Sequence, residues 1–307
     1  MKIINSVNEK INDSTVLCIG NFDGVHSVHQ KIINKVIQDA KKNSCKSMVI
    51  TFRHHPISFL NPNNAPKILT PLNEKLRIFE EMGVDYLGLY DFLEVKNIPP
   101  KQFVKYLVNN YGMKKIVCGF NFRFGHNNFG NIKYLDELSK EFGFDVDIIE
   151  LLNLYNKKIS STKIRSYIKY GDIEKANDFL GRFFSITGEV IRGKQLGRKL
   201  GFPTANLKYE AKFCIPQNGV YSTITEFNGL KYASMTNIGY NPTFRNKYIS
   251  IETFILDFEG DLYNQEIKVN FVKKMRNETL FSDVHALIDQ LEKDKINTIN
   301  ITKKYLK

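Results

Sequence analysis

The sequence predicts two domains, a parallel α/β domain followed by an antiparallel β domain with a C-terminal helix. The chain has 307 residues, which exceeds the usual size of a single domain and favours two domains of about 150 residues each. Up to residue 182, short apolar runs alternate with amphipathic stretches, as in a sheet flanked by helices. From residue 183 onward, extended segments are separated by turns. We therefore expect domains at residues 1–182 and 183–307.

Short apolar runs are the expected strands of the first domain, and Gly and Pro mark the ends of the helices between them. The strands are expected at residues 16–19, 48–52, 86–89, 116–118 and 146–149. One helix runs from Gln30 to about Lys41, a second ends at Gly83, and a third opens at Pro99-Pro100 and closes before Gly112. This pattern is typical of an α/β sheet that binds nucleotides.

Turn signals organise the second domain. Asn228-Gly229 separates two extended runs and predicts a two-residue hairpin, because both residues tolerate positive φ. Glu259-Gly260 predicts a weaker turn between a strand over 251–258 and a strand through 267–269. A final helix packed on the sheet is predicted from apolar residues at helical spacing behind a possible Ser282 cap: Val284, Leu287, Ile288 and Leu291.

The charge balance is basic. A net charge of +12 and a pI near 9.3 suit a protein that handles polyanions, which include nucleic acids and nucleotide phosphates. The lysines are dispersed, and no basic stripe with interleaved aromatic residues accompanies them. A solvated Lys-rich surface is therefore the simpler interpretation, and nucleic-acid binding is a weaker second hypothesis.

The sequence predicts a cytoplasmic protein without a membrane partner. Its start turns polar at once, and no apolar run approaches the roughly 18 to 20 residues that span a bilayer. Cysteines stand apart, without a Cys-x-x-Cys pair, at positions 18, 45, 118 and 214. We expect reduced thiols rather than a zinc site or disulfides.

The first motif lies between an expected strand and the helix from Gln30. Its turn contains Gly20, Phe22, Asp23 and Gly24, and His26 and His29 follow. A helix N-terminus behind a glycine turn attracts an anion, and the two imidazoles can donate to phosphate oxygens. A metal pair and two surface histidines are alternatives, although no third metal ligand with suitable spacing follows.

Two further motifs carry glycines, aromatic residues, hydroxyls and cations. The loop from Gly119 to Gly125 directly follows a strand and contains Asn121, Arg123 and Phe124, which suits close approach to a flat ligand or simple core packing. Near the end of the domain, a helix that closes at Gly171 begins with a cluster of hydroxyls and cations: Ser160, Ser161, Thr162, Lys163 and Arg165. A capping box explains one hydroxyl, but not the whole cluster.

The most specific stretch covers residues 188–207. Its loop combines glycines with basic residues and can present N–H groups to phosphates, although a glycine-rich β turn is the alternative. The loop residues expected to bind phosphate are Gly193, Lys194, Gly197, Arg198 and Gly201. On the following extended segment, Thr204 and Asn206 alternate and share one face, so both side-chain oxygens can reach one Mg²⁺.

At the first-domain motifs the chain resembles the FMN adenylyltransferase module of bacterial bifunctional riboflavin kinase/FAD synthetases. The resemblance implies a Rossmann-like nucleotidyltransferase fold. It also implies that His26, His29 and Arg165 act on the ATP phosphates, as do the hydroxyls Ser160, Ser161 and Thr162. Asn121 resembles a residue that positions nucleotide and flavin, with Arg123 and Phe124 beside the flavin.

Residues 188–207 resemble the signature of riboflavin kinase, whose Pro-Thr-Ala-Asn segment carries the Mg-ATP site. Further matches follow in the family's order at 237–244, 251–258 and 275–281. The resemblance implies an antiparallel β-barrel in which Glu252 is the general base for the ribityl hydroxyl. Arg276 and Glu278 resemble residues that bind the flavin.

Over roughly residues 14 to 295, the resemblance implies that ATP phosphorylates riboflavin to FMN and then adenylylates FMN to FAD, with Mg²⁺ in both steps. Two positions depart from the family pattern. Val28 replaces a glycine and could crowd the nucleotide, whereas Asn264 replaces a glycine in a turn. The alternatives are an enzyme active only as a kinase, and a nucleic-acid or regulatory binding protein on the same fold.

Overall fold

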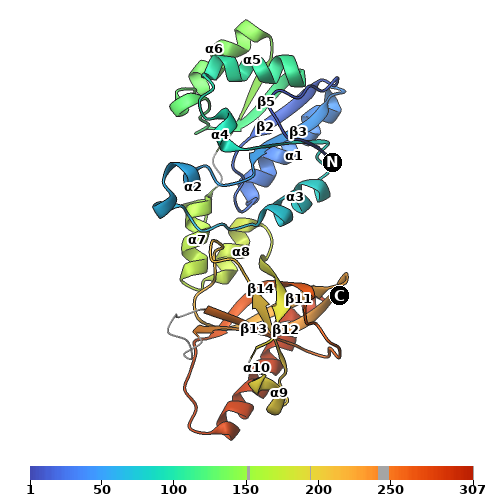
Figure 1. Ribbon diagram of the computed structural model, residues 1–307, viewed down its shortest axis with the longest axis vertical. Coiled ribbons are helices and arrows are strands. Elements are labelled where there is room, and N and C mark those ends of the chain that lie inside the picture. Colours follow the sequence, from blue (N-terminus) through green and yellow to red (C-terminus); the bar gives the residue numbers. More distant parts are fainter. Residues whose placement is uncertain (151–152, 194, 241–248, 307) are drawn as a thin grey trace. The chain divides into compact units, whose positions relative to one another are not determined.

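Residues 1–150, 153–193, 195–240 and 249–306 are described by the computed structural model of the chain (Figure 1). Contacts divide the chain into two units, Met1–Ser161 and Thr162–Lys307, and each is described here by itself. The domain boundary at 182/183 stays a prediction.

Unit 1 is built on a six-stranded sheet in the order β1-β4-β3-β2-β5-β6, in which every pairing is parallel. The strands are β1 (Lys2–Ile4), β2 (Thr15–Ile19), β3 (Lys46–Phe52), β4 (Tyr86–Tyr90), β5 (Met113–Gly119) and β6 (Asp145–Ile149). The strands expected from the apolar runs are confirmed. Strand β1 was not expected, because three residues at a sheet edge are too few to display a period.

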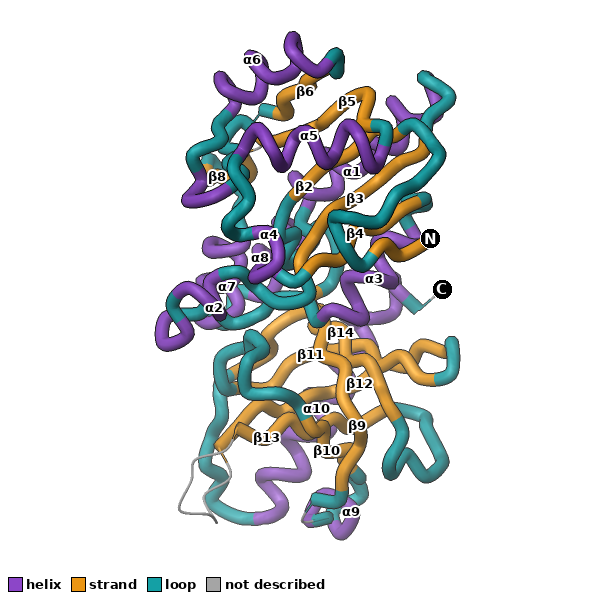
Figure 2. The backbone as a smooth tube through the Cα atoms, turned by 45° about the horizontal axis from the view of Figure 1, so that its top comes forward, coloured by secondary structure: helices purple, strands orange, loops and turns teal. Residues whose placement is uncertain are grey.

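Helices cover both faces of this sheet, as the alternation of side chains along the strands requires. Val16 and Cys18 belong to the core beneath α1 (Ser27–Lys42) and α3 (Leu72–Glu81), whereas Leu17 belongs to the core beneath the helices of the opposite face. Those helices are α5 (Pro100–Tyr111), which crosses the sheet in Figure 2, and α6 (Ile132–Phe142). The remaining short elements of this unit are α2 (Ile57–Leu60), α4 (Phe92–Val95), the 3₁₀ turns Pro62–Asn64 and His126–Asn128, and the β7–β8 pair (Asn153–Leu154 and Lys157–Lys158).

The strand order places a topological switch point between β2 and β5. The chain leaves β2 through α1 toward β3 on one side of the sheet, whereas β5 lies on the other side of β2. In open α/β sheets, ligands bind beyond the carboxyl ends of the strands at such a point. The first two predicted loops follow β2 and β5, so the topology brings both to this crevice.

Unit 2 contains a closed antiparallel barrel in the order β10-β13-β12-β11-β14-β9 (Figure 2). The strands are β9 (Phe184–Ile191), β10 (Thr204–Lys208), β11 (Gly219–Phe227), β12 (Leu230–Tyr240), β13 (Ile249–Ile255) and β14 (Glu266–Arg276). Helices α7 (Ser161–Lys169) and α8 (Ile173–Leu180) precede the barrel, α9 (Leu196–Lys199) lies in the glycine-rich loop, and α10 (Val284–Thr302) packs on β11, β12 and β14 before a last 3₁₀ turn (Lys303–Tyr305). The barrel with its C-terminal helix confirms the expected fold.

The two turns predicted for this unit have different outcomes. The hairpin at Asn228-Gly229 is confirmed, since Phe227 pairs with Leu230 and both turn residues have positive φ. The turn predicted at Glu259-Gly260 is wrong: β13 ends at Ile255, and β14 pairs with β11 and β9 instead of β13. Barrel closure inserts β12 and β11 between these strands, so residues 256–265 form a longer crossing connection.

The predicted starts of two helices also differ from the structure. Helix α10 is capped by Asp283, whose carboxylate accepts the backbone N–H of Ala286 at 2.9 Å, and Ser282 instead donates its hydroxyl to Asp283. Helix α1 begins at Ser27 rather than Gln30, because His26 caps it. Val28 and His29 therefore lie on its first turn.

Candidate active sites

The loop after β2 ends in a pair of stacked histidines at the N-terminus of α1. His26 has extended backbone (φ −71°, ψ 171°), and its Nδ1 accepts the backbone N–H of His29 at 3.4 Å. The two rings are nearly parallel, with centroids 3.5 Å apart, and Phe22 meets the His29 ring edge-on at 5.2 Å. His26 is only 4% exposed, so a pair of surface histidines is excluded.

His29 is the more unusual of the two rings. Burial, together with the nearby charges of His26 and Lys75, lowers its pKa well below the ordinary value, so the ring is neutral at pH 7. Its Nδ1 is buried without a hydrogen-bond partner among the described residues. A buried polar atom of this kind at a helix N-terminus is available to a bound group.

Asp23 fixes the glycine turn. Its carboxylate accepts the backbone N–H groups of Leu69 at 3.0 Å and Thr70 at 3.2 Å, and its carbonyl accepts the hydroxyl of Ser161 at 2.7 Å. The sequence predicts that the turn containing Asp23 binds ATP, a role that stays a prediction, and in the structure the Asp23 carboxylate accepts hydrogen bonds from neighbouring backbone. The turn around Gly20 and Gly24 is thereby tied to the segment before α3.

The loop after β5 borders a cavity of about 620 Å³ at the switch point. Gly20 and Asn121 line it together, so the structure unites the two predicted loops, whereas His26 and His29 lie outside its lining. Phe124 is buried, and its ring stacks on Phe122 with centroids 5.5 Å apart. Sequence reasoning placed Arg123 and Phe124 here but missed other lining residues, among them Phe52, Pro56, Phe92, Asn97 and His126.

The hydroxyl cluster lies at the start of α7. Ser161 is the first residue of that helix and is held by the carbonyl of Asp23, while Ser160 directly precedes it. Thr162 and Arg165 follow in the first turns of α7 and belong to unit 2.

In unit 2, the glycine-rich loop packs closely on β10. A Cβ on Gly193 would overlap the side-chain amide of Asn206, and a Cβ on Gly197 would overlap the carbonyl of Phe202. Gly201 has φ +83°, which favours glycine. These glycines let the loop lie against the predicted metal ligands. Lys194, also assigned to phosphate, lies outside the described residues, as do residues 241–244 of the match at 237–244.

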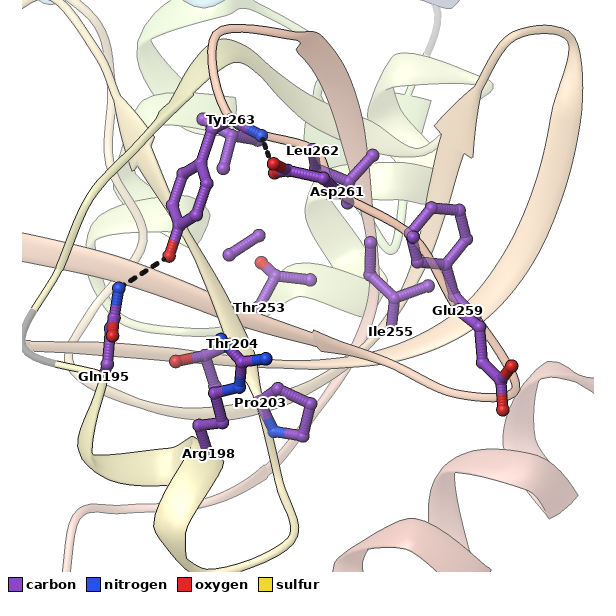
Figure 3. A pocket seen from close by; sticks show the side chains of 14 residues that line it. Gln195, Arg198, Pro203, Thr204, Thr253, Ile255, Glu259, Asp261, Leu262 and Tyr263 are labelled. Carbon is purple, nitrogen blue, oxygen red and sulfur yellow. Dashed lines mark hydrogen bonds between the residues drawn. The ribbon is translucent and has the colours of Figure 1, made fainter.

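A first barrel cavity of about 550 Å³ opens beside this loop (Figure 3). Arg198 and Thr204 line it on one side, and the connection 258–263 lines it on the other. The amide of Gln195 donates to the hydroxyl of Tyr263 at 3.0 Å, and the Arg192 guanidinium lies 5.3 Å from the centre of the Tyr263 ring. Polar and aromatic groups thus face one another across the opening.

A second barrel cavity of about 330 Å³ lies beside α10 and is mainly apolar. Its walls include the aromatic and aliphatic side chains of Phe202, Met235, Phe254, Phe281, Leu287 and Leu291. Glu252, Arg276 and Glu278 bring charge into it. Thr204 lines both cavities, so they adjoin at this residue.

The predicted metal ligands and the predicted base share one face of the barrel wall. Asn206 lies directly opposite Glu252 in the antiparallel pairing of β10 with β13, and Thr204 lies opposite Phe254. Directly opposed residues point to the same side of a sheet. Asn237 of β12 is the cross-strand partner of Glu252 on its other side.

Arg276 is held by a buried carboxylate that sequence reasoning missed. Asp294 of α10 is 2% exposed and accepts Nε and Nη2 of Arg276 at 2.9 and 2.8 Å, and Gln290 donates to its other oxygen at 2.9 Å. Phe281 covers the guanidinium, 5.7 Å from the ring centre. The available signal was the acidic residue on the apolar side of the final helix.

Comparisons with known proteins agree with the resemblance found for each half of the chain. The family model for FAD synthetase matches residues 8–163, and that for riboflavin kinase matches residues 180–302. A protein of Buchnera aphidicola named bifunctional riboflavin kinase/FMN adenylyltransferase is 38% identical over 99% of this chain and 99% of its own length. The chain belongs to this bifunctional family. A Bacillus subtilis protein of the same name is 38% identical over 93% of this chain and 92% of its own length.

One solved structure superposes on nearly the whole of this chain. This structure, described as a macrolide-efflux protein from Streptococcus pneumoniae, has a TM-score of 0.89 and 30% identity to this chain. The match covers 98% of this chain and 99% of the other. Across the ranges of this chain that the structure describes, no helix combines the length and apolar character needed to cross a membrane.

Proposed function

We propose that this chain phosphorylates riboflavin to FMN at its barrel and adenylylates FMN to FAD at its parallel sheet, with ATP as co-substrate in both steps. The observation that carries the proposal is the position of Thr204, which lines both a larger cavity of mixed polarity and a more apolar cavity containing Glu252. Transfer of a phosphoryl group between two ligands requires such adjoining sites.

In the kinase step, the more apolar cavity beside α10 takes the flavin ring, and the larger cavity lined by Arg198 takes the nucleotide. The γ-phosphate then lies near Thr204, and the ribityl 5′-hydroxyl approaches it from the Glu252 side. Glu252 accepts the hydroxyl proton as oxygen attacks phosphorus and ADP leaves. Arg276, held by Asp294, and Glu278 orient the flavin within its cavity.

The residues at this junction fit Mg²⁺. Thr204 and Asn206 supply a hydroxyl and an amide oxygen from one face of β10, and hard cations bind oxygen ligands of this kind. Gly193 leaves room for the Asn206 side chain. When bound, the ion neutralises phosphate charge, while Thr204 and Asn206 fix its place on the strand.

In the adenylylation step, the switch-point cavity takes the flavin of FMN, and the N-terminus of α1 takes the triphosphate. The FMN phosphate attacks the α-phosphate and pyrophosphate leaves, without a covalent enzyme intermediate. His26, His29, Ser160 and Ser161 are the proposed phosphate ligands of unit 1, together with backbone around Gly20 and Gly24. The phosphate roles of Thr162 and Arg165 stay predictions from the sequence. Asn121, Arg123 and Phe124 position the flavin.

We propose a cytoplasmic location, where ATP is available and thiols stay reduced. The four cysteines are free in the structure, which is the usual state in a reducing compartment.

Incubation of the purified protein with riboflavin, Mg²⁺ and ATP tests the proposal directly. We expect FMN to appear first and FAD to follow on chromatography. Supplying FMN and ATP separates this function from that of an enzyme active only as a kinase, which would form no FAD. Tight, salt-sensitive binding of DNA or RNA without flavin turnover would instead favour a nucleic-acid binding protein.

Val28 is the position that bears on the kinase-only alternative. It lies on the first turn of α1, half-buried against the core beneath that helix, where the backbone does not require glycine. We propose that adenylylation persists with weakened ATP binding. Val28→Gly should lower the KM for ATP in FAD formation. An unchanged KM and turnover would contradict the hypothesis that Val28 crowds the nucleotide.

A further inference from the structure

A buried lysine beneath the nucleotide loop has no role in the steps described above. Lys75, on the first turn of α3, is 6% exposed. Lysines are rarely buried to this extent without partners, because removing an ammonium from water is costly. Its position therefore calls for a specific set of acceptors.

Those acceptors lie at the carboxyl ends of β2 and β3. Nζ of Lys75 donates to the carbonyl of Asn21 at 3.2 Å, to Oγ1 of Thr51 at 3.3 Å and to the carbonyl of Phe52 at 3.4 Å. Thr51 in turn donates its hydroxyl to the same Asn21 carbonyl at 3.1 Å. An ammonium has three donors, and each has an acceptor here. Lys75 thereby fixes the start of the loop that leads from Gly20 to His26.

The charge of Lys75 also reaches the histidine pair. Burial lowers the pKa of Lys75 to about 8, while the Asp23 carboxylate opposes this shift, so the amine is mainly protonated at pH 7. Its positive charge contributes to the lowered pKa of His29. A small cavity of about 30 Å³ next to Lys75 is lined by further charged or titratable groups: Asp23, Arg53 and His55.

We propose that Lys75 is a positioning residue of the adenylyltransferase, fixing the Gly20–His26 loop and supplying a buried positive charge toward the triphosphate. This inference rests on the proposed function of unit 1. A loop held from below presents its N–H groups and imidazoles in one geometry, and the ammonium stabilises negative charge that develops on the departing pyrophosphate. Neither effect involves the kinase cavities.

The test is Lys75→Met, which keeps most of the length of the side chain and removes its charge and donors. FAD formation from FMN and ATP should fall about 10- to 100-fold, mainly in kcat and with little change in the KM for FMN, because small displacements of positioned groups have effects of this size. Riboflavin phosphorylation by the same protein should stay unchanged. Lys46→Met is the matched control, since Lys46 is half-exposed at the opposite end of β3.

A second pair of measurements covers the case in which Lys75→Met fails to fold. Lys75→Arg keeps the charge, so it should recover part of the turnover, and its FAD formation should persist to higher pH than that of the wild type. In the wild type, turnover should fall as pH rises through about 8, where Lys75 loses its proton. The groups facing this site that could also titrate are His26, His29, Asp23 and His55.

The outcomes separate the two proposals. If the wild type makes no FAD, the proposed function of unit 1 fails. If the wild type makes FAD and folded Lys75→Met makes it equally fast, only the role of Lys75 fails. Should Lys75→Met not fold, an identical pH profile for wild type and Lys75→Arg overturns that role.

Discussion

Glu252 stands between two amide side chains on the barrel wall, Asn206 of β10 on one side and Asn237 of β12 on the other. This setting keeps a carboxylate next to the proposed metal ligands and at the edge of an apolar cavity. An alcohol is a poor nucleophile, and a carboxylate within reach of its proton raises its reactivity.

We expect Glu252→Gln to reduce FMN formation by about two to four orders of magnitude, the usual contribution of a general base. FAD formation from supplied FMN should persist, because it uses other residues. Chromatographic rates with riboflavin or FMN as substrate provide the measurement. The control is Glu266→Gln, which changes an exposed carboxylate at the start of β14. Near-normal kinase activity in Glu252→Gln would contradict the role of Glu252 as the general base.

Asp294 is the second residue whose replacement we expect to affect the kinase reaction. Replacing it by Asn removes the charge that holds Arg276, and we expect a cost in stability of about 1.5–3 kcal/mol, the usual contribution of hydrogen bonds to a charged group. The KM for riboflavin should rise several-fold while the KM for ATP changes little. Asp289→Asn, an exposed change on the same helix, should alter neither constant. A normal riboflavin KM in a folded Asp294→Asn variant would contradict the link to Arg276.

Among the secondary-structure elements, α1, β5 and β6 are joined by a network of ion pairs. Asp39 of α1 contacts Nζ of Lys35 and Nζ of Lys115, each at 2.6 Å, and both lysines also lie 3.3 Å from Asp147 of β6. Burial alone would raise the pKa of Asp39, but hydrogen bonds from Lys115 and Lys35 hold it below the ordinary value. Folding therefore favours the ionised carboxylate.

The sign of this shift fixes a pH dependence. The stabilisation is present above the ordinary Asp pKa of about 3.9 and is lost as pH falls through the lower folded value. Asp39→Asn should lower the free energy of unfolding by about 1–3 kcal/mol at pH 7. The difference from wild type should shrink toward pH 3 in denaturant titrations. Asp145→Asn, exposed on β6, should leave unfolding unchanged, and a constant Asp39→Asn difference at all pH values would contradict the network.

Sequence patterns predicted most elements because their signals are local. Apolar runs identified β2 to β6, and Asn228-Gly229 identified its hairpin. Pairing order is not local: nothing in residues 251–269 indicates that β13 and β14 are separated by two strands in the barrel. Lys75 was missed for a related reason, since a lysine in a helix usually reaches solvent. Its spacing with Ile78 and Phe79 on the buried side of α3 was the usable signal.

For the whole molecule, the two reactions are assigned mainly to residues in different units of the chain, Thr162 and Arg165 being the exceptions. Glu252 and Thr204 belong to unit 2, whereas the histidine pair and the switch-point cavity belong to unit 1. The matched family models divide the chain in the same sense. Substitutions in one cavity should therefore change one reaction at a time.

His29→Ala tests this separation. The change removes one proposed phosphate ligand and one ring of the stacked pair, so FAD formation should fall about 10- to 1,000-fold, as expected for loss of a group that stabilises developing charge. Riboflavin phosphorylation should remain at the wild-type rate, measured on the same preparation. Loss of both reactions together would point instead to misfolding, whereas normal FAD formation in the folded variant would contradict the assignment of His29.

The position of Thr204 between the two barrel cavities has a consequence for inhibitor design. A linear compound with an isoalloxazine ring at one end, a short anionic linker in the middle and adenosine at the other could occupy both chambers at once. Such a compound would avoid the entropic cost of gathering two separate molecules. FAD has this architecture, so the product of the second reaction resembles a bisubstrate ligand of the first.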